Sequence, residues 1–121
     1  MKANFDITAM DMNELEGVKT TLKKRFPELI KCYLEDAETH LKGIEEGLEG
    51  GDMNAIAKNA HPLKSSSAVL GVFGVSDIAR AMEETAKAGG EIDTIRPLVA
   101  PLKEALDYAV PKLRALLDDA V

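Results

Sequence analysis

Aromatic side chains are scarce in this sequence of 121 residues: Trp is absent, and three Phe and two Tyr make up 4% of the chain. Stacking platforms for single-stranded nucleic acid need aromatic side chains, so this kind of binding surface is not expected. Basic residues are also in deficit, because 15 Lys and Arg face 21 Asp and Glu, which gives 15 − 21 = −6 at pH 7. This net charge argues against duplex nucleic acid and anionic membranes as partners, since both attract basic patches.

Cysteine occurs once, at Cys32, which excludes an internal disulfide framework and is typical of a reducing compartment. No apolar stretch reaches the ~18 residues of a membrane helix. Asp6 and Asp11 interrupt the N-terminal stretch, which therefore lacks the basic-then-apolar pattern of a signal peptide. We expect a cytoplasmic protein with one domain, because ~100–150 residues are typical of a single core.

Apolar residues recur at helical spacing between glycine-bearing breaks. In the first long segment most steps between apolar residues are three or four, and alternation of period two fails. The stripe of that segment comprises Phe26, Ile30, Tyr33, Leu34, Ala37, Leu41, Ile44 and Leu48. We expect a bend near Phe26, because a residue that precedes proline disfavours α geometry.

Three further segments have the same spacing, at about residues 53–70, 74–88 and 93–117. A shorter and weaker helix is expected at about 12–25, before the first long one. Four amphipathic helices with short loops predict an all-α fold, an antiparallel four-helix bundle with an additional N-terminal helix. The bundle core is expected to span about 27–118.

Several residues are expected to end or bend these helices. Asp52 is a good N-cap for the second segment, and Gly71 is placed to close it as a C-terminal cap. Asp93 or Thr94 is the expected N-cap of the last helix. Pro101 and Pro111 then fall inside that helix and should bend it.

His61 is the strongest candidate for a chemically reactive residue in the chain. On a helix with 100° per residue it lies on the shoulder of the apolar stripe, so one ring nitrogen can face solvent. Lys58, Lys64 and Ser65 are its neighbours at i−3, i+3 and i+4. Two lysines beside a histidine form a positive spot in an acidic protein, which would attract a phosphoryl group. An ordinary surface histidine on a solvated helix is the alternative that this spacing leaves open.

The stretch from His61 to Gly71 resembles the histidine-containing phosphotransfer (HPt) domain of bacterial multistep phosphorelays. That family has the approximate pattern H-x-L-K-G-S-S-x-x-L-G, and the resemblance extends over about residues 25–117. The matching residues are His61, Leu63, Lys64, Ser66, Ser67, Leu70 and Gly71, with Val75, Ile78, Met82 and Glu83 in the helix that follows. Two positions depart from the pattern: Ser65 replaces the usual glycine, and Pro62 directly follows the histidine.

The resemblance implies that His61 is the phosphorylated nucleophile, attacking through Nε2 a phosphoaspartate on a response-regulator receiver domain. The phosphoryl group would then pass to an aspartate on another receiver. Lys64, with Lys58, would stabilise the phosphoryl oxygens. The partner-binding residues implied are Ala57, Lys58, Ser65 and Ala68.

The resemblance also implies a protein without autonomous kinase activity and without a cofactor of its own, since the receiver brings Mg²⁺. A hybrid sensor histidine kinase is a further candidate partner, and a stand-alone monomer is expected. No metal site is expected, because His40, His61 and Cys32 have no ligand spacing. His40 is expected to pack and hydrogen-bond at the core boundary, and Cys32 to be a buried or half-buried thiol.

Three other functions compete with this one. A nucleotide-dependent kinase is disfavoured, because no glycine-rich phosphate loop is present. The dimerisation helices of sensor kinases also have a reactive histidine, but it is usually followed by an acidic residue, whereas Pro62 follows here. A non-catalytic helical-bundle adaptor, which docks a signalling protein without phosphotransfer, stays open as the main alternative.

Overall fold

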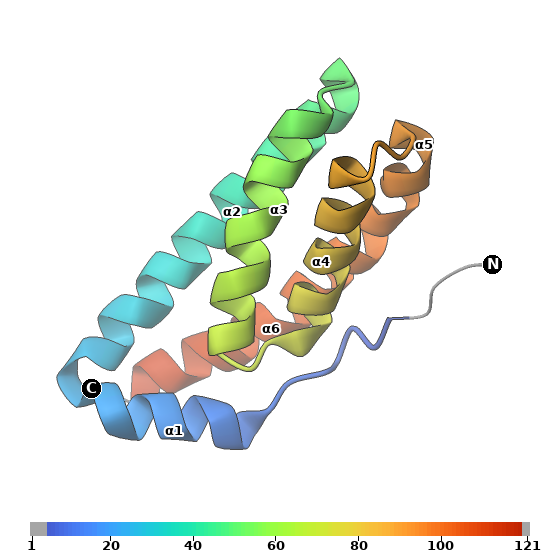
Figure 1. The fold of residues 1–121 in the computed structure, drawn as a ribbon. Helices are drawn as coiled ribbons and strands as arrows, with labels where there is room; N and C mark the ends of the chain where they lie inside the picture. Colours follow the sequence, from blue (N-terminus) through green and yellow to red (C-terminus); the bar gives the residue numbers. More distant parts are fainter. Residues whose placement is uncertain (1–4, 120–121) are drawn as a thin grey trace.

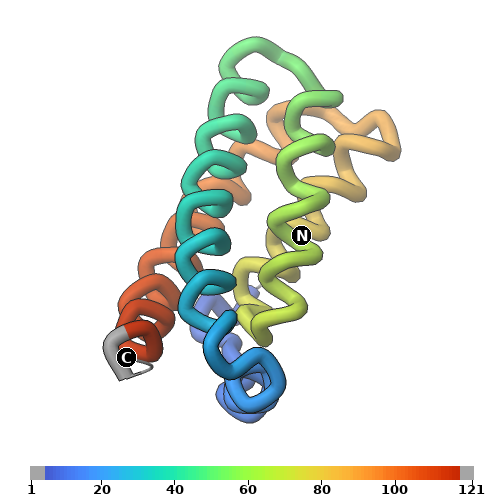
Figure 2. Tube along the Cα trace, turned by 90° about the vertical axis from the view of Figure 1, so that its left-hand side faces the viewer, coloured from blue at the N-terminus to red at the C-terminus, as the bar shows by residue number. Residues whose placement is uncertain are grey.

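The computed structural model describes the backbone of residues 5–119 and the side chains of residues 5–117. Its elements are α1 (Met12–Leu22), η1 (Lys23–Arg25), α2 (Phe26–Gly50), α3 (Met53–Val69), α4 (Phe73–Lys87), α5 (Ile92–Ile95), η2 (Arg96–Leu98) and α6 (Val99–Asp119). The long helices α2, α3, α4 and α6 lie side by side with alternating direction, and α1 crosses one end of them (Figures 1 and 2). The predicted all-α four-helix bundle with an N-terminal helix is confirmed.

The core consists of the apolar stripes that the helical spacing predicted. Every α-helix contributes to its fully buried large side chains, which are Leu15, Phe26, Ile30, Ile44, Ile56, Leu63, Leu70, Ile78, Met82, Ile95, Leu102 and Leu113. The bend before α2 lies at η1, where Lys23 has a positive φ of 51°. The expected cause was wrong, because Phe26 itself has helical φ and ψ angles and begins α2. No helix within residues 5–119 is long and apolar enough to span a membrane.

Glycines let α2 and α3 approach closely. A Cβ atom on Gly43 would collide with the Asn59 side chain, and one on Gly47 would lie 3.0 Å from that of Ile56. The Asn59 amide is held in this contact because its Nδ2 donates to the Ala55 carbonyl, while its Oδ1 lies 3.2 Å from His40 Nδ1. The half-buried His40 thus packs and hydrogen-bonds, as predicted.

Both caps expected for α3 are present. Asp52 accepts a hydrogen bond from the backbone N–H of Ala55 at 3.1 Å. At the other end Gly71 has a φ of +73°, and its N–H donates to the Ala68 carbonyl. The Gly71 carbonyl in turn accepts from the backbone N–H of Asp11 at 2.8 Å, so the turn between α3 and α4 also anchors the start of α1.

The predicted start of the last helix was wrong. Glu91, and not Asp93 or Thr94, is the N-cap, and the segment begins with the short α5. The chain then tightens into η2 around Pro97, whose missing N–H interrupts the α-helical bonding. Pro101 consequently lies in the first turn of α6, where a missing N–H costs little, and not in the helix interior as predicted.

Cys32 is exposed, which corrects the prediction of a buried or half-buried thiol. The inward stripe of α2 passes through Ile30, Tyr33 and Ala37. Cys32 precedes Tyr33 by one residue, so its side chain lies about 100° from Tyr33 around the helix axis and further still from Ile30 and Ala37.

Replacing Gly71 with Ala tests how much of the bundle depends on this turn. An alanine in the left-handed backbone conformation lowers the free energy of unfolding by roughly 1–2 kcal/mol. The new Cβ would also lie 2.8 Å from the Asp11 carbonyl oxygen, so the loss should be at least about twice that of a purely conformational change. Gly51→Ala is the matched control, because Gly51 has a φ of +66° and a methyl group there would have no neighbour within 4 Å. Equal losses of unfolding free energy in urea titrations of the two variants would contradict this packing role.

Candidate phosphotransfer site

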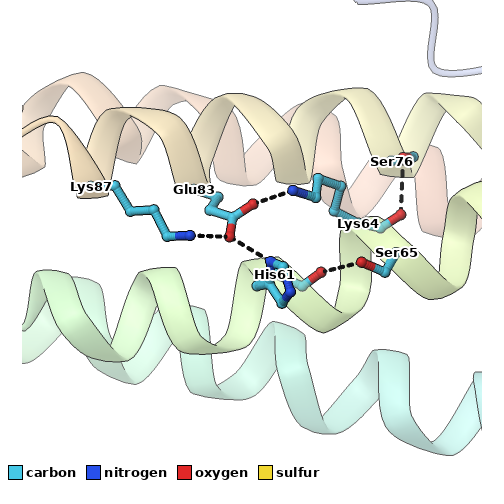
Figure 3. Close-up of polar contacts among 6 residues, drawn as sticks. All are labelled: His61, Lys64, Ser65, Ser76, Glu83 and Lys87. Carbon is cyan, nitrogen blue, oxygen red and sulfur yellow. Dashed lines mark hydrogen bonds and ion pairs between the residues drawn. The ribbon is translucent and has the colours of Figure 1, made fainter.

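His61 lies in the middle of α3 with its ring at the surface, where 59% of the side chain is exposed. Its Nδ1 atom is 2.6 Å from Oε2 of Glu83, which comes from the neighbouring helix α4 (Figure 3). The other ring nitrogen, Nε2, points away from this contact because the two nitrogens of an imidazole diverge. The histidine is therefore held at one nitrogen and open at the other.

Glu83 is the centre of the polar cluster. Only 3% of its side chain is exposed, yet it meets three nitrogen groups. Besides His61, the ammonium of Lys64 lies 2.5 Å from Oε1, and that of Lys87 lies 2.9 Å from Oε2. Lys64 and Lys87 approach the carboxylate from opposite sides (Figure 3). A buried charge needs such partners, since an unpaired one would be strongly unfavourable.

Burial by itself raises the pKa of Glu83, but hydrogen bonds from Lys64, Lys87 and His61 outweigh it and hold the pKa at about 2. The carboxylate is thus ionised at neutral pH and can only accept hydrogen bonds. It follows that Nδ1 of His61 carries a proton and donates it to Glu83. In the neutral imidazole the free lone pair is then on Nε2, which is the solvent-facing nitrogen.

Serine hydroxyls bind the backbone of α3 around the histidine. Ser65 Oγ donates to the His61 carbonyl at 3.2 Å, and Ser66 Oγ donates to the Pro62 carbonyl at 2.9 Å. From α4, the buried Ser76 donates to the Lys64 carbonyl at 3.0 Å (Figure 3). This hydrogen bond fixes the position of α4 along the axis of α3. Pro62 leaves α3 continuous from Met53 to Val69.

A shallow pocket opens beside the histidine, between α3 and α4. Its lining residues are Asn54, Ala57, Lys58, His61, Glu83 and Lys87. The predicted residues Ala57 and Lys58 therefore share one surface with His61. Ser65 is exposed on the next turn, and Ala68 is half-buried further toward the C-terminal end of α3, so neither lines the pocket.

Glu83 and Lys87 were not predicted as site residues, although Glu83 was placed in the helix that follows the motif. A signal was available in the apolar stripe of α4, which contains Ala79, Met82 and Ala86. Glu83 falls on that inward stripe, and a carboxylate at an inward position requires a buried cationic partner. Within the described residues no group of three or more His, Cys, Asp or Glu could hold a metal ion.

The bundle and the braced histidine define the class of a helical phosphotransfer domain, and comparison with known proteins supports that class. The family model of the Hpt domain matches residues 28–120. The structure is similar to the crystal structure of histidine-containing phosphotransfer protein B (HptB) from Pseudomonas aeruginosa PAO1, with a TM-score of 0.78 and 22% identity over 92% of each chain. No match was found among curated protein sequences.

The chain belongs to the Hpt domain family. The family membership supports a histidine phosphotransfer role in a phosphorelay, in which Hpt domains work with response-regulator receiver domains. The resemblance that the His61–Gly71 stretch indicated is thereby confirmed.

The pH dependence of stability provides a test of the Glu83 cluster. The pKa of Glu83 is about 2 in the folded protein against an ordinary 4.5, so its contribution is present above about pH 4.5 and is lost as the pH falls toward 2. Glu83→Gln should lower the unfolding free energy at pH 7 by roughly 2–3 kcal/mol, and the difference from wild type should shrink toward zero near pH 2. Urea titrations across this range measure it, with the exposed neighbour Glu84→Gln as control. A difference that is constant with pH would contradict the pairing.

Proposed function

We propose that His61 is the phosphorylated residue of this Hpt domain. It accepts a phosphoryl group from a receiver-domain phosphoaspartate and passes it to an aspartate of another receiver. The observation that carries this proposal is the 2.6 Å contact between Nδ1 of His61 and the buried, ionised Glu83. That contact leaves Nε2 unprotonated in the neutral ring and directed to solvent, where a partner can approach.

In the first step the Nε2 lone pair attacks phosphorus, the P–Nε2 bond forms, and the bond from phosphorus to the aspartyl oxygen breaks. The aspartate leaves as a carboxylate, and no proton moves because Nδ1–H is already in place. The ring gains positive charge as the bond forms, and the Glu83 carboxylate faces that charge at Nδ1. Transfer to the second receiver is the same step in reverse.

The partner is proposed to supply what this chain does not contain. Phosphoryl transfer depends on in-line positioning and charge neutralisation, and the receiver's acidic pocket with its Mg²⁺ would provide both at the aspartyl side. The contact surface around His61 is proposed to include Ala57, Lys58, Ser65 and Ala68. Small residues at three of these positions would let a receiver come close to Nε2.

Phosphotransfer to His61→Gln tests the assignment. A labelled phosphoreceiver should transfer phosphate to the wild-type protein in an acid-labile, alkali-stable form, as expected for a P–N bond, and the variant should accept none. His40→Gln is the matched control because His40 is the other of the two histidines and lies half-buried at the α2–α3 contact. Unchanged labelling of His61→Gln would overturn the assignment.

The same experiment separates the proposal from a non-catalytic adaptor. An adaptor would bind receivers with equal affinity in the wild type and in His61→Gln, and neither protein would carry phosphate. Receiver binding without any labelling of the wild type, across the receiver domains of the source organism, would therefore favour the adaptor.

A second test addresses Glu83 as a positioning residue. With ¹⁵N-labelled histidine, the neutral His61 ring should be almost entirely the Nδ1–H tautomer in the wild type. Glu83→Gln can present its amide N–H₂ to Nδ1 instead, so a mixture of tautomers should appear, and the rate of phosphate acceptance should fall roughly ten-fold. Glu84→Gln should change neither quantity. A single tautomer in Glu83→Gln with a normal rate would contradict the role.

A further inference from the structure

We propose that the phosphoryl group on Nε2 is held by Lys58 and Lys87, and that Lys64 acts on it only indirectly, through Glu83. This inference rests on the proposed phosphorylation of His61. It reverses the expectation from the sequence motif, in which Lys64 is the principal phosphoryl ligand.

The position of the pocket favours Lys58 and Lys87. Both line the depression beside His61, whereas Lys64 does not. Lys58 lies one turn before His61 on α3, at the level of the pocket, and Lys64 lies one turn after it. Because α4 runs antiparallel to α3, Lys87 reaches the same end of the cluster, and Lys64 occupies the opposite side of Glu83 (Figure 3).

The contacts of the lysines support the same division of roles. Lys64 is the least exposed, at 27% of its side chain, and its ammonium is paired with Oε1 of Glu83. Its backbone is also fixed, since its carbonyl accepts from Ser76. Lys58 is exposed and has no ion pair with any residue from 5 to 117. It is therefore available for a phosphoryl oxygen without breaking a contact.

Lys87 can change partners more easily than Lys64. Its side chain is 63% exposed against 27% for Lys64, so its ammonium can turn toward the solvent side of the cluster without being buried. When Lys87 turns from Oε2 of Glu83 to a phosphoryl oxygen, Lys64 and His61 still hold the carboxylate. The exchange leaves Glu83 paired and keeps His61 in its tautomer.

The charges of the cluster fit this division. In the phosphorylated state the cationic His61 ring and Lys64 both face the Glu83 carboxylate, so Glu83 stays paired when Lys87 turns away. A phosphoryl group brings close to two negative charges at neutral pH, and Lys58 and Lys87 together match them.

The ³¹P chemical shift of the phosphoryl group reports which lysines contact it. The intact protein is phosphorylated with phosphoramidate, whose P–N bond breaks as the bond to Nε2 forms and ammonia leaves. The resulting phosphohistidine is then observed by ³¹P NMR at one alkaline pH, where the P–N bond is stable and the phosphoryl group is a dianion. Loss of a contacting ammonium group changes the field at phosphorus, so Lys58→Gln and Lys87→Gln should each displace the resonance by more than its linewidth. The double variant should show the sum.

Lys64→Gln should displace the resonance by less than half as much as either variant, and Lys112→Gln, on α6, should not displace it. A larger shift in Lys64→Gln than in Lys58→Gln and Lys87→Gln would overturn the inference while leaving the phosphorylation of His61 intact. Absence of a phosphohistidine signal in the wild type, or its persistence in His61→Gln, would instead overturn the proposed function.

Discussion

The site depends on one carboxylate that the fold has removed from water. Glu83 is buried between α3 and α4, and its negative charge is tolerated because an imidazole and two ammonium groups surround it. The same contacts that neutralise Glu83 also define the chemistry of His61. The proton on Nδ1 is there because an ionised carboxylate can only accept, and the lone pair is on Nε2 for the same reason.

The precision of this contact comes from the way the two helices are joined. Asp52 begins α3 and Gly71 ends it, so the length of the helix before the turn is fixed at both ends. Ser76 then donates to the Lys64 carbonyl, one helical turn beyond His61. This bond fixes the position of α4 along the axis of α3. Glycines at 43 and 47 bring α2 close on the other side and support α3 from behind. A small shift in any of these contacts would separate Nδ1 from the carboxylate.

Apolar spacing was sufficient to predict the fold, because each helix buries one continuous stripe and stripes of period 3.6 have few other ways to pack. It failed where a local interruption overrides periodicity. Around Pro97 the stripe continues but the backbone bonding does not, so the start of the last helix was misplaced. The error at Cys32 came from its proximity to Tyr33 in sequence, which on a helix means a different face. The first error concerns where a helix begins, and the second concerns the face of a helix on which a residue lies.

The site was predictable only on the helix that contains the motif. His61 and its lysine neighbours share α3, so spacing alone relates them. Glu83 and Lys87 are 22 and 26 residues further along, and only the antiparallel pairing of α3 with α4 brings them to the ring.

A phosphotransfer protein must bind the phosphoryl group well enough to accept it and loosely enough to release it, and the Glu83 cluster is suited to both. The carboxylate and a phosphoryl group compete for the same ammonium groups, so neither can hold all of them. Before transfer, Lys64 and Lys87 pair with Glu83 and with no other acidic side chain among residues 5–117. After transfer, a lysine that turns to the phosphoryl oxygens weakens its bond to Glu83, and that loss limits how far the phosphorylated state is stabilised. In the proposed mechanism the buried carboxylate thereby moderates the affinity of the site for the phosphoryl group.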